Sequence, residues 1–513
     1  MTAAVGPGAA ALHGVPSLDW VVLAPVVLPI LGVIAILVLD VLRPGGERLT
    51  RLMDLVALVA LGLAGASLAW LLVQGGERTT ACVAGDGVDL PGCSYAVSGL
   101  TLTLQAVVLA GAIGCLLLAL DGPGARDRST HHMLLLTATA GALALAGARD
   151  LATLAVAFET SSLPVVGLVA LRRDAQGAQA GVTLLLTAIG SLGLLVLGAA
   201  LLYAATGSLY LDRVATVLAT PGLDRRLSAV AGVGALIAIA GVAFKVSAVP
   251  FHLWTPDTYA GAPMPVAAFL AVVSKSAGVA AVLILLGVGL PSLAAGWAPI
   301  VGVLAVVTMT VGNLVAMRQR VAIRLLAWST VAQAGWVLAP LAAARTGTPA
   351  SVRAAAAASV GYLIAYAAAS LAAFSVVVLL ARHHPAGEEH TLDAYRGLAR
   401  REPVGAFVLM FALACLAGLP PGVMGLVAKV VAVRPLVDSG AWAVAVIASL
   451  NVILGLVYYL RWAGLLVTRP ETQPPTWRVT LAEGLVLGGA GAACVALSVA
   501  GQAIAGVVPG VLR

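Results

Sequence analysis

Long apolar runs, separated by short breaks rich in Gly, Pro and Arg, follow one another along almost the whole chain. Crossing a bilayer takes about 20 apolar residues in a helix, whereas a membrane strand alternates apolar and polar residues over about ten positions. The runs show no such alternation, and a backbone in a bilayer must satisfy its own hydrogen bonds. The pattern predicts an all-α polytopic membrane protein of about fourteen transmembrane helices, centred near residues 31, 62, 109, 140, 160, 192, 240, 273, 307, 333, 367, 412, 450 and 495.

The composition agrees with a chain that lies mostly in a membrane. Of its 513 residues, 61% are hydrophobic and only 10% are charged, whereas a soluble domain has about 25% charged residues. The first apolar run, residues 20–42, is too long for the core of a signal peptide, so we expect it to remain as the first helix. No polar stretch is long enough for a soluble domain, and residues 1–513 are predicted to form a single transmembrane domain.

The formal net charge of +7 bears on topology. Basic residues of membrane proteins gather in cytoplasmic loops, which explains the surplus without nucleic acid as a partner. With the N-terminus outside, the cytoplasmic loops hold 17 arginines against 7 in the opposite loops. The sequence therefore predicts both termini on the extracytoplasmic side.

The five cysteines show no CxxC motif and no metal-ligand spacing, so we expect this chain to bind no metal and no cofactor. Cys82 and Cys93 share one polar loop, which the predicted topology places in an oxidising compartment. Disulfides persist in such compartments. The two cysteines are a candidate disulfide, with two free thiols as the alternative.

Lysine is rare in this chain. Of 29 basic residues, only Lys245, Lys275 and Lys429 are lysines, and each falls within an apolar run. Arginine does not release its proton in proteins, but a desolvated lysine can. Ionisable residues at membrane depth are costly and usually functional. The three lysines are therefore candidate proton carriers; the alternative is side chains that extend to the membrane interface.

Glu159 is the one acidic residue that we predict in the middle of a span. A lone buried carboxylate is costly unless it is neutralised or paired, and pairing with Lys245 is the simplest hypothesis. A closed pair would hold the lysine proton, and an open pair would let the desolvated lysine pass it on. A static structural ion pair is the alternative.

Prolines interrupt the two spans that carry Lys245 and Lys429. Pro250 follows the first lysine, and Pro420 and Pro421 precede the second. Proline inside a helix removes a backbone hydrogen bond, and broken helices in the two halves of a transporter mark its transport site. We therefore expect discontinuous helices 7 and 12 within two inverted five-helix repeats, spans 4–8 and 9–13.

This organisation divides the transmembrane domain into four parts. The N-terminal spans 1–3 occupy residues 1–125, and the C-terminal span occupies residues 478–513. The first repeat covers residues 130–290, and the second covers residues 295–465.

Several further polar residues in the predicted spans are candidates for a water or proton path. The alternative is ordinary hydrogen bonding or packing between helices, which we favour for the tyrosines. These candidates are His252, Asp257, Ser329, Gln333 and Tyr366.

Four stretches resemble a known family. They are FKVSAVPFHLWTPDTYAGAPMPVAAFLAVVSKSAG from Phe244, GNLVAMRQRVAIRLLAWSTVAQAGW from Gly312, DAYRGLARREP from Asp393 and LAGLPPGVMGLVAKVVAV from Leu416. They are similar to the subunit N family of the bacterial proton-pumping NADH–quinone oxidoreductase, respiratory complex I, among its antiporter-like subunits. The resemblance covers roughly residues 100–465. Related L- and M-type subunits usually read WLPDAH-like where this chain has WTPDTYAGAP.

The resemblance implies a role for each buried charge. Glu159 would modulate Lys245, Lys275 would connect the two halves, and Lys429 would serve the exit half-channel. Many relatives have His where this chain has Gln333. Glutamine cannot take up a proton, so a relay at that point would depend on water.

The implied function is proton translocation by a membrane subunit of NADH:quinone oxidoreductase (translocase class EC 7.1.1), with no redox centre in this chain. Alternatives are a subunit of an Mrp-type Na+/H+ antiporter and a membrane-arm subunit of a related hydrogenase complex. The complex would use FMN, iron–sulfur clusters, NADH and a quinone. The Ala-, Gly- and Arg-rich composition suggests a GC-rich bacterium, which makes menaquinone a candidate and the plasma membrane the expected location. Implied partners are K-, M- and L-type subunits, the lateral helix of the L-type subunit, and lipids.

Overall fold

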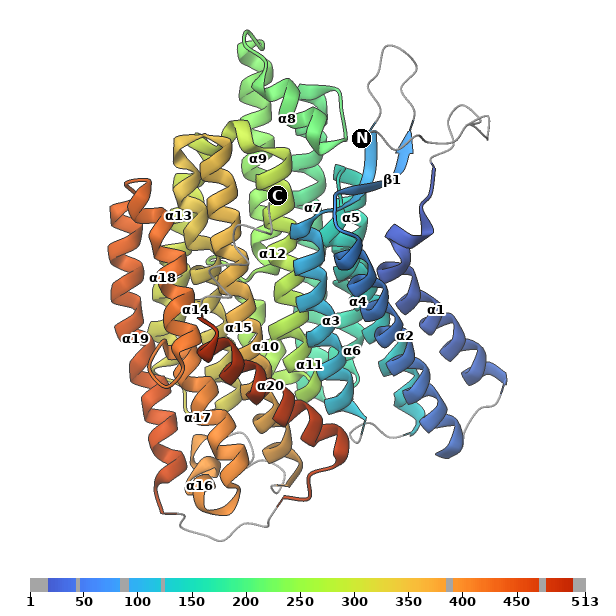
Figure 1. Cartoon of the computed structure of the whole chain (residues 1–513), viewed down its shortest axis with the longest axis vertical. Coiled ribbons are helices and arrows are strands. Elements are labelled where there is room, and N and C mark those ends of the chain that lie inside the picture. Colours follow the sequence, from blue (N-terminus) through green and yellow to red (C-terminus); the bar gives the residue numbers. More distant parts are fainter. Residues whose placement is uncertain are drawn as a thin grey trace.

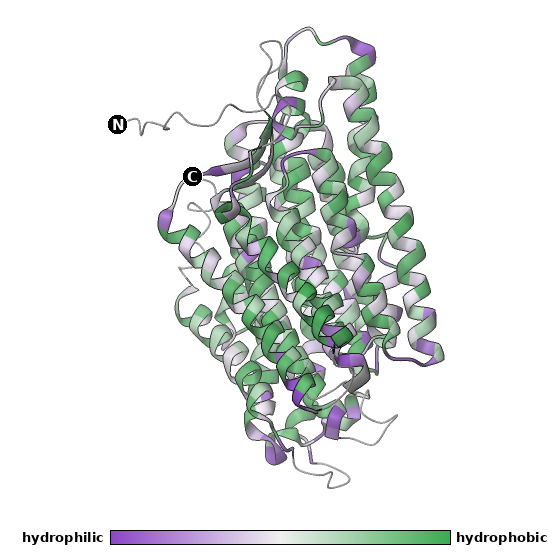
Figure 2. Cartoon of the chain, turned by 90° about the vertical axis from the view of Figure 1, so that its right-hand side faces the viewer, coloured by the Kyte–Doolittle hydropathy of each residue, from purple (hydrophilic) through white to green (hydrophobic). Residues whose placement is uncertain are grey.

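The structure is a computed structural model that describes residues 17–42, 47–83, 92–120, 125–383, 391–469 and 477–501. Long helices run side by side along the molecule (Figure 1). Figure 2 shows hydrophobic residues along the middle of these helices and hydrophilic residues gathered toward the two ends. This distribution fits a bundle that crosses a bilayer, and the predicted all-α membrane fold is confirmed.

The first part of the chain forms an outer group of helices and one hairpin. The elements are α1 (Trp20–Leu42), α2 (Glu47–Gln74), β1 (Arg78–Val83), β2 (Gly92–Val97), α3 (Gly99–Ala119), α4 (Ala125–Gly147), α5 (Leu151–Thr160), α6 (Leu163–Ala170), α7 (Ala175–Thr206), α8 (Leu211–Ala219), α9 (Arg225–Lys245) and α10 (Trp254–Gly261).

The remaining helices include short π-helical and 3-10 segments, labelled η. The elements are α11 (Met264–Phe269), η1 (Leu270–Ser274), α12 (Lys275–Leu283), η2 (Ile284–Gly289), η3 (Pro291–Leu293), α13 (Ala294–Ala316), α14 (Ala322–Leu338), η4 (Ala339–Thr346), α15 (Pro349–His383), η5 (Leu392–Tyr395), α16 (Leu398–Arg401), α17 (Pro403–Ala417), α18 (Val423–Asp438), α19 (Trp442–Val467) and α20 (Leu481–Val499).

Twelve helical segments of the described residues are long and apolar enough to cross a membrane, and they coincide with twelve of the predicted spans. The two other predicted spans, centred at 140 and 412, coincide with α4 and with α17. α17 has only 15 residues and is followed, after a break, by α18. A helix therefore lies at each of the fourteen predicted positions. Twelve helical segments of the described residues are long and apolar enough to count as spans by themselves.

Three helices form the centre of the bundle. The segment from α11 to η2 is buried along nearly its whole length, and most of α14–η4 and of α15 is buried as well. Peripheral helices such as α1 and α7 keep most of their surface exposed, including large apolar side chains. Because lipid tails are as apolar as these side chains, such exposure is expected of a membrane protein. All three lysines are buried within the bundle.

The β1–β2 hairpin marks one end of the bundle. The strands pair antiparallel with Cys82 opposite Cys93, and the two sulfurs are bonded as a disulfide. The backbone N–H of Arg149, after α4, donates to the carbonyl of Ser94 in β2. The hairpin therefore packs on the ends of membrane helices at this side.

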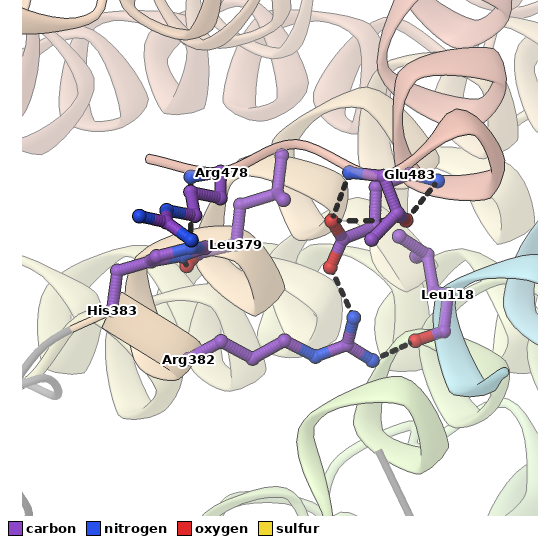
Figure 3. A network of polar contacts seen from close by, with 7 residues as sticks. Leu118, Leu379, Arg382, His383, Arg478 and Glu483 are labelled. Atoms are coloured by element: carbon purple, nitrogen blue, oxygen red, sulfur yellow. Dashed lines mark hydrogen bonds and ion pairs between the residues drawn. The ribbon is translucent and has the colours of Figure 1, made fainter. Parts of the chain in front are cut away.

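The start of the C-terminal helix α20 is fixed to the rest of the bundle by a polar network (Figure 3). The Arg382 guanidinium at the end of α15 pairs with the Glu483 carboxylate and donates to the carbonyl of Leu118 in α3. Glu483 is also part of the capping box that begins α20 at Thr480. One buried carboxylate therefore caps α20 and joins it to α15.

We expect Glu483→Ala to lower the free energy of unfolding of the detergent-purified protein by about 2 to 3 kcal/mol, because the partly buried Arg382 would lose its partner. Thermal unfolding measures this loss. Asp393→Ala is the control, since Asp393 forms an exposed ion pair with Arg396 that should contribute less than about 1 kcal/mol. Equal stability of the two variants would contradict the assigned anchoring role.

Candidate functional site

Lys245 lies at a break in a neighbouring helix. The lysine ends α9, and its side chain is buried. Its ammonium group donates to Ser162 Oγ at 2.6 Å and to the Phe158 carbonyl at 3.4 Å, and lies 4.9 Å from the centre of the Phe158 ring. The Ser162 N–H, which a continuous helix would direct to the Phe158 carbonyl, bonds to the carbonyl of Glu159 instead. The break between α5 and α6 therefore frees the carbonyl that receives Lys245.

Lys275 lies at a second break, directly after α9. Its ammonium group donates to the Val246 carbonyl at 3.0 Å and to the hydroxyl of Ser247, and the Trp254 ring lies 5.4 Å away. Ser247 adopts a positive φ of 59°, which non-glycine residues rarely do. Because Lys275 follows the π-helical turn η1, both sides of this contact have irregular backbone, as is common at functional sites.

Lys429 lies at a third break, between α17 and α18. Its ammonium group donates to the carbonyls of Leu416 at 3.1 Å and Ala417 at 2.5 Å. The Trp336 ring centre is 5.5 Å away. The side chain is buried although α18 itself is partly exposed.

The three lysines share one environment. Each ammonium group donates to backbone carbonyls at a break in a helix and lies within cation–π distance of an aromatic ring. The last carbonyls of a helix carry partial negative charge, which stabilises a cation without a full anion. Among the described residues, no carboxylate lies within ion-pair distance of these lysines.

The pair that we hypothesised between Glu159 and Lys245 is not closed in this structure. Both carboxylate oxygens of Glu159 are buried without a hydrogen-bond partner among the described residues. The ammonium group turns to Ser162 and to the Phe158 carbonyl instead. The structure therefore presents the open arrangement of the two side chains.

Gln333 connects a hydroxyl network to Lys429. Its amide nitrogen donates to the Tyr459 hydroxyl at 3.0 Å and to the Leu416 carbonyl at 3.2 Å, the same carbonyl that receives Lys429. Its amide oxygen accepts from the hydroxyl of Tyr362. Ser329 lies 2.5 Å from Tyr459. Tyr362 therefore belongs to the polar network that includes Gln333 and Tyr459.

Tyr366 lies between the networks of Lys275 and Gln333. Its hydroxyl donates to the Ala271 carbonyl at 2.9 Å and lies 3.3 Å from Thr330 Oγ1. Ala271 precedes Lys275 by four residues in a helical segment, so the two residues lie on one face. The structure thus brings Tyr366, Ser329 and Gln333 into the centre of the bundle.

Within the described residues, His252 and Asp257 form no hydrogen bond or ion pair with the lysines. His252 is buried against Trp328, with ring centres 5.3 Å apart, and its Nδ1 has no partner among the described residues. Asp257 is exposed and forms an ion pair with Arg324 at 2.7 Å. The two residues follow one break but point into different surroundings.

Both predicted proline breaks are present. Pro250 lies in the turns between α9 and α10, and Pro420 and Pro421 lie between α17 and α18. The two lysines do not occupy the same place relative to these breaks. Lys245 is the last residue of the helix before its break, whereas Lys429 lies in the helix after it.

Four residues of the site were not predicted from the sequence: Ser162, Ser247, Trp336 and Tyr459. They stand in apolar surroundings and resemble ordinary packing residues. The break beside Ser162 had a signal, because Pro164 follows it at the first turn of α6, where proline is favoured. Within the described part of the chain, no three His, Cys, Asp or Glu residues are grouped to hold a metal ion.

Comparisons with known proteins agree with this architecture. A family model described as "NADH:quinone oxidoreductase/Mrp antiporter, TM" matches residues 148–455. NADH-quinone oxidoreductase subunit N 2 of Streptomyces griseus is 41% identical over 471 residues, 90% of this chain and 85% of that protein. Subunit N of Salinispora tropica is 44% identical over 480 residues, 90% of this chain and 88% of that protein.

A solved structure of respiratory complex I from Thermus thermophilus with bound aureothin contains a chain of the same fold. Its TM-score is 0.77 at 30% identity, over 95% of this chain and 99% of that one. The chain therefore belongs to the family of antiporter-like membrane subunits shared by NADH:quinone oxidoreductases and Mrp antiporters. Within this family it belongs to the subunit N group of the NADH-quinone oxidoreductases, as its motifs predicted.

Proposed function

We propose that this chain, a proton-translocating membrane subunit N of complex I, moves protons along Lys245, Lys275 and Lys429 while quinone is reduced in other subunits. The observation that carries the proposal is that all three lysines are buried on carbonyls at helix breaks, with no carboxylate partner in the part of the chain that the structure describes. A lysine held in this way has no full anion to fix its proton. It can therefore alternate between the charged and the neutral form.

The proposed route uses the contacts between the breaks. Lys275 binds the backbone directly after Lys245, and Tyr366 connects the helical turn before Lys275 to α14. Gln333 then shares the Leu416 carbonyl with Lys429. We propose that water completes this route and that protons pass from Lys245 through Lys275 to Lys429.

Buried polar atoms without protein partners support a hydrated route. The Glu159 carboxylate oxygens and His252 Nδ1 are such atoms in the described part of the chain. Buried polar groups of native proteins are nearly always hydrogen-bonded, and ordered water supplies the missing partner. Water bound to the Glu159 carboxylate would satisfy this group while the pair is open. When the pair closes, the carboxylate would hold the proton on Lys245.

The proposal includes the two inverted repeats, with α4–α12 as the first and α13–α19 as the second. In each set the fourth span is broken, at α9–α10 and at α17–α18, which supports the assignment. We further propose that the hairpin end of the bundle is extracytoplasmic, because a disulfide persists in an oxidising compartment and the arginine distribution favours the same orientation.

The chain works within respiratory complex I beside other subunits. We propose that K-, M- and L-type subunits flank it in a bacterial plasma membrane, and that FMN, the iron–sulfur clusters and the quinone site belong to other subunits.

Lys245→Arg tests the proposal in membrane vesicles that contain the whole complex. Arginine keeps the positive charge but does not release its proton. We expect NADH-driven proton pumping to fall by about tenfold or more, since positioned proton-transfer groups contribute on the order of 100-fold to the reactions they serve. Proton uptake and NADH oxidation are followed together.

Arg226→Lys is the control, because it exchanges the same two residue types at an exposed position. It should leave pumping unchanged. Unchanged pumping by an assembled Lys245→Arg complex would mean that positive charge alone suffices there. Lys245 would then be a structural cation rather than a carrier.

A further inference from the structure

A cavity of about 430 Å³ opens between η4, α15 and α18. It lies where η4 and α18 end and α15 begins, at the same end of the bundle as the hairpin. Its wall combines polar and charged side chains with small ones. They include Thr346, Ser351, Ala354, Ala358, Arg434 and Asp438.

The polar residues lie toward the mouth of the cavity. Arg434 and Asp438 are largely exposed, and their charged groups are 3.8 Å apart. Ala358, which lies deeper along α15, is only 1% exposed. A cavity with this polar lining has the groups that water needs to bind.

A chain of contacts leads from the deep end of the cavity to Lys429 through two aromatic rings. Tyr362 follows Ala358 by one helical turn, about 6 Å along α15. Its ring stacks on Trp336 with centres 5.7 Å apart and an angle of 13° between the planes. Trp336 is in turn the residue whose ring lies against the Lys429 ammonium group.

The rings are held in place from the side of Lys429. The Tyr362 hydroxyl donates to Gln333, which shares the Leu416 carbonyl with the lysine. Both aromatic side chains are buried, at 3% exposure each. Two stacked apolar faces placed between the cavity and the lysine would interrupt a path of water.

We propose that this cavity is the outward vestibule of the proton path and that the stacked pair Trp336–Tyr362 is the gate between the vestibule and Lys429. A change in the Trp336 side-chain rotamer would open a contact between the ammonium group and vestibule water. The proton would then leave from Nζ to water near Asp438. This inference rests on the proposed function, because it assigns the exit of the same route.

Cysteine labelling tests the vestibule without changing the gate. Ala358→Cys and Ala357→Cys alter adjacent alanines of equal burial, but only Ala358 lines the cavity. Vesicles are treated with a charged methanethiosulfonate reagent from either side, and the labelled peptide is quantified by mass spectrometry. From the hairpin side we expect position 358 to react about tenfold faster or more, because a thiol next to water ionises more readily than one in an apolar contact.

Trp336→Ala tests the gate in the whole complex. With the ring removed, water can join Lys429 to the vestibule, so we expect protons to leak back and fewer protons to be pumped for each NADH oxidised. Trp336→Phe keeps an aromatic face at the gate and should leak less than Trp336→Ala. If Trp336→Ala leaked no more protons than the unchanged protein, the gate would be overturned, even if Lys245→Arg abolishes pumping.

Equal labelling of positions 357 and 358 would overturn the vestibule, and so would faster labelling of position 358 from the opposite side. These outcomes would leave the lysine route itself intact. Normal pumping by Lys245→Arg together with selective labelling of position 358 would instead contradict the proposed function. The cavity would then be an ordinary surface feature.

Discussion

Lys429→Arg is expected to lower NADH-driven proton pumping by about tenfold or more, a loss of the size expected for a positioned proton-transfer group. The guanidinium can donate to the same two carbonyls, Leu416 and Ala417, and can stack on Trp336. The site would therefore keep a bound cation but lose a proton that can leave. Proton uptake per NADH is the quantity to measure, in vesicles with matched amounts of assembled complex.

Lys429→Met separates charge from proton release at this position. Methionine has a similar unbranched shape without the ammonium group, and we expect it to pump as poorly as the arginine variant. If arginine pumped normally and methionine did not, Lys429 would serve only as a fixed positive charge. If methionine pumped normally, no carrier would be needed at this position.

Gly425→Ala is expected to prevent normal packing of α18 against α17. A Cβ atom at this position would lie 1.6 Å from the carbonyl oxygen of Cys415 and 3.0 Å from its Cα. Backbone cannot move aside as a side chain can, so the two helices would have to separate. We expect a cost of about 3 kcal/mol or more, seen as loss of the subunit from the purified complex or as a lower temperature of unfolding.

The position of Gly425 makes this effect functional as well as structural. Gly425 precedes Lys429 by one turn, so the two residues face α17 together. The close approach at the glycine brings the lysine to the carbonyls of Leu416 and Ala417. Any Gly425→Ala complex that assembles should therefore also pump poorly.

Gly464→Ala is the control for this prediction. Gly464 lies in the peripheral helix α19, and a Cβ there would meet no atom within 4 Å. Alanine also favours a helix over glycine, so this variant should be as stable as the unchanged protein or slightly more stable. Equal stability of the alanine variants at positions 425 and 464 would mean that α17 and α18 adapt at little cost.

The open Glu159–Lys245 arrangement has a local cause that the sequence did not reveal. Ser161 and Ser162 end one helix and begin another, and their hydroxyls both donate to the Phe158 carbonyl. Lys245 joins the same carbonyl and the Ser162 hydroxyl. The apolar pattern predicts one continuous span here, and within such a span the Glu159 carboxylate was the only partner expected for the lysine.

The network around Gln333 illustrates a second limit. Gln333 and Tyr459 are 126 residues apart in sequence but directly hydrogen-bonded. Gln333 was predicted as a candidate because polar side chains are rare in apolar spans. Tyr459 in α19 resembles an ordinary packing residue, since tyrosine has a large apolar ring. Only the fold decides which tyrosines turn their hydroxyls toward the centre of the bundle.

The sequence by itself determined the membrane class, the positions of the helices, the two proline breaks and the three lysines. These features depend on local properties: the length of apolar runs, the missing N–H of proline, and the rarity of a charge at membrane depth. The tertiary structure decided what the lysines bind. Their carbonyl and aromatic partners are on other helices, and a carbonyl becomes an acceptor only where a helix is broken. Such partners depend on packing between distant segments, which no local pattern of residues specifies.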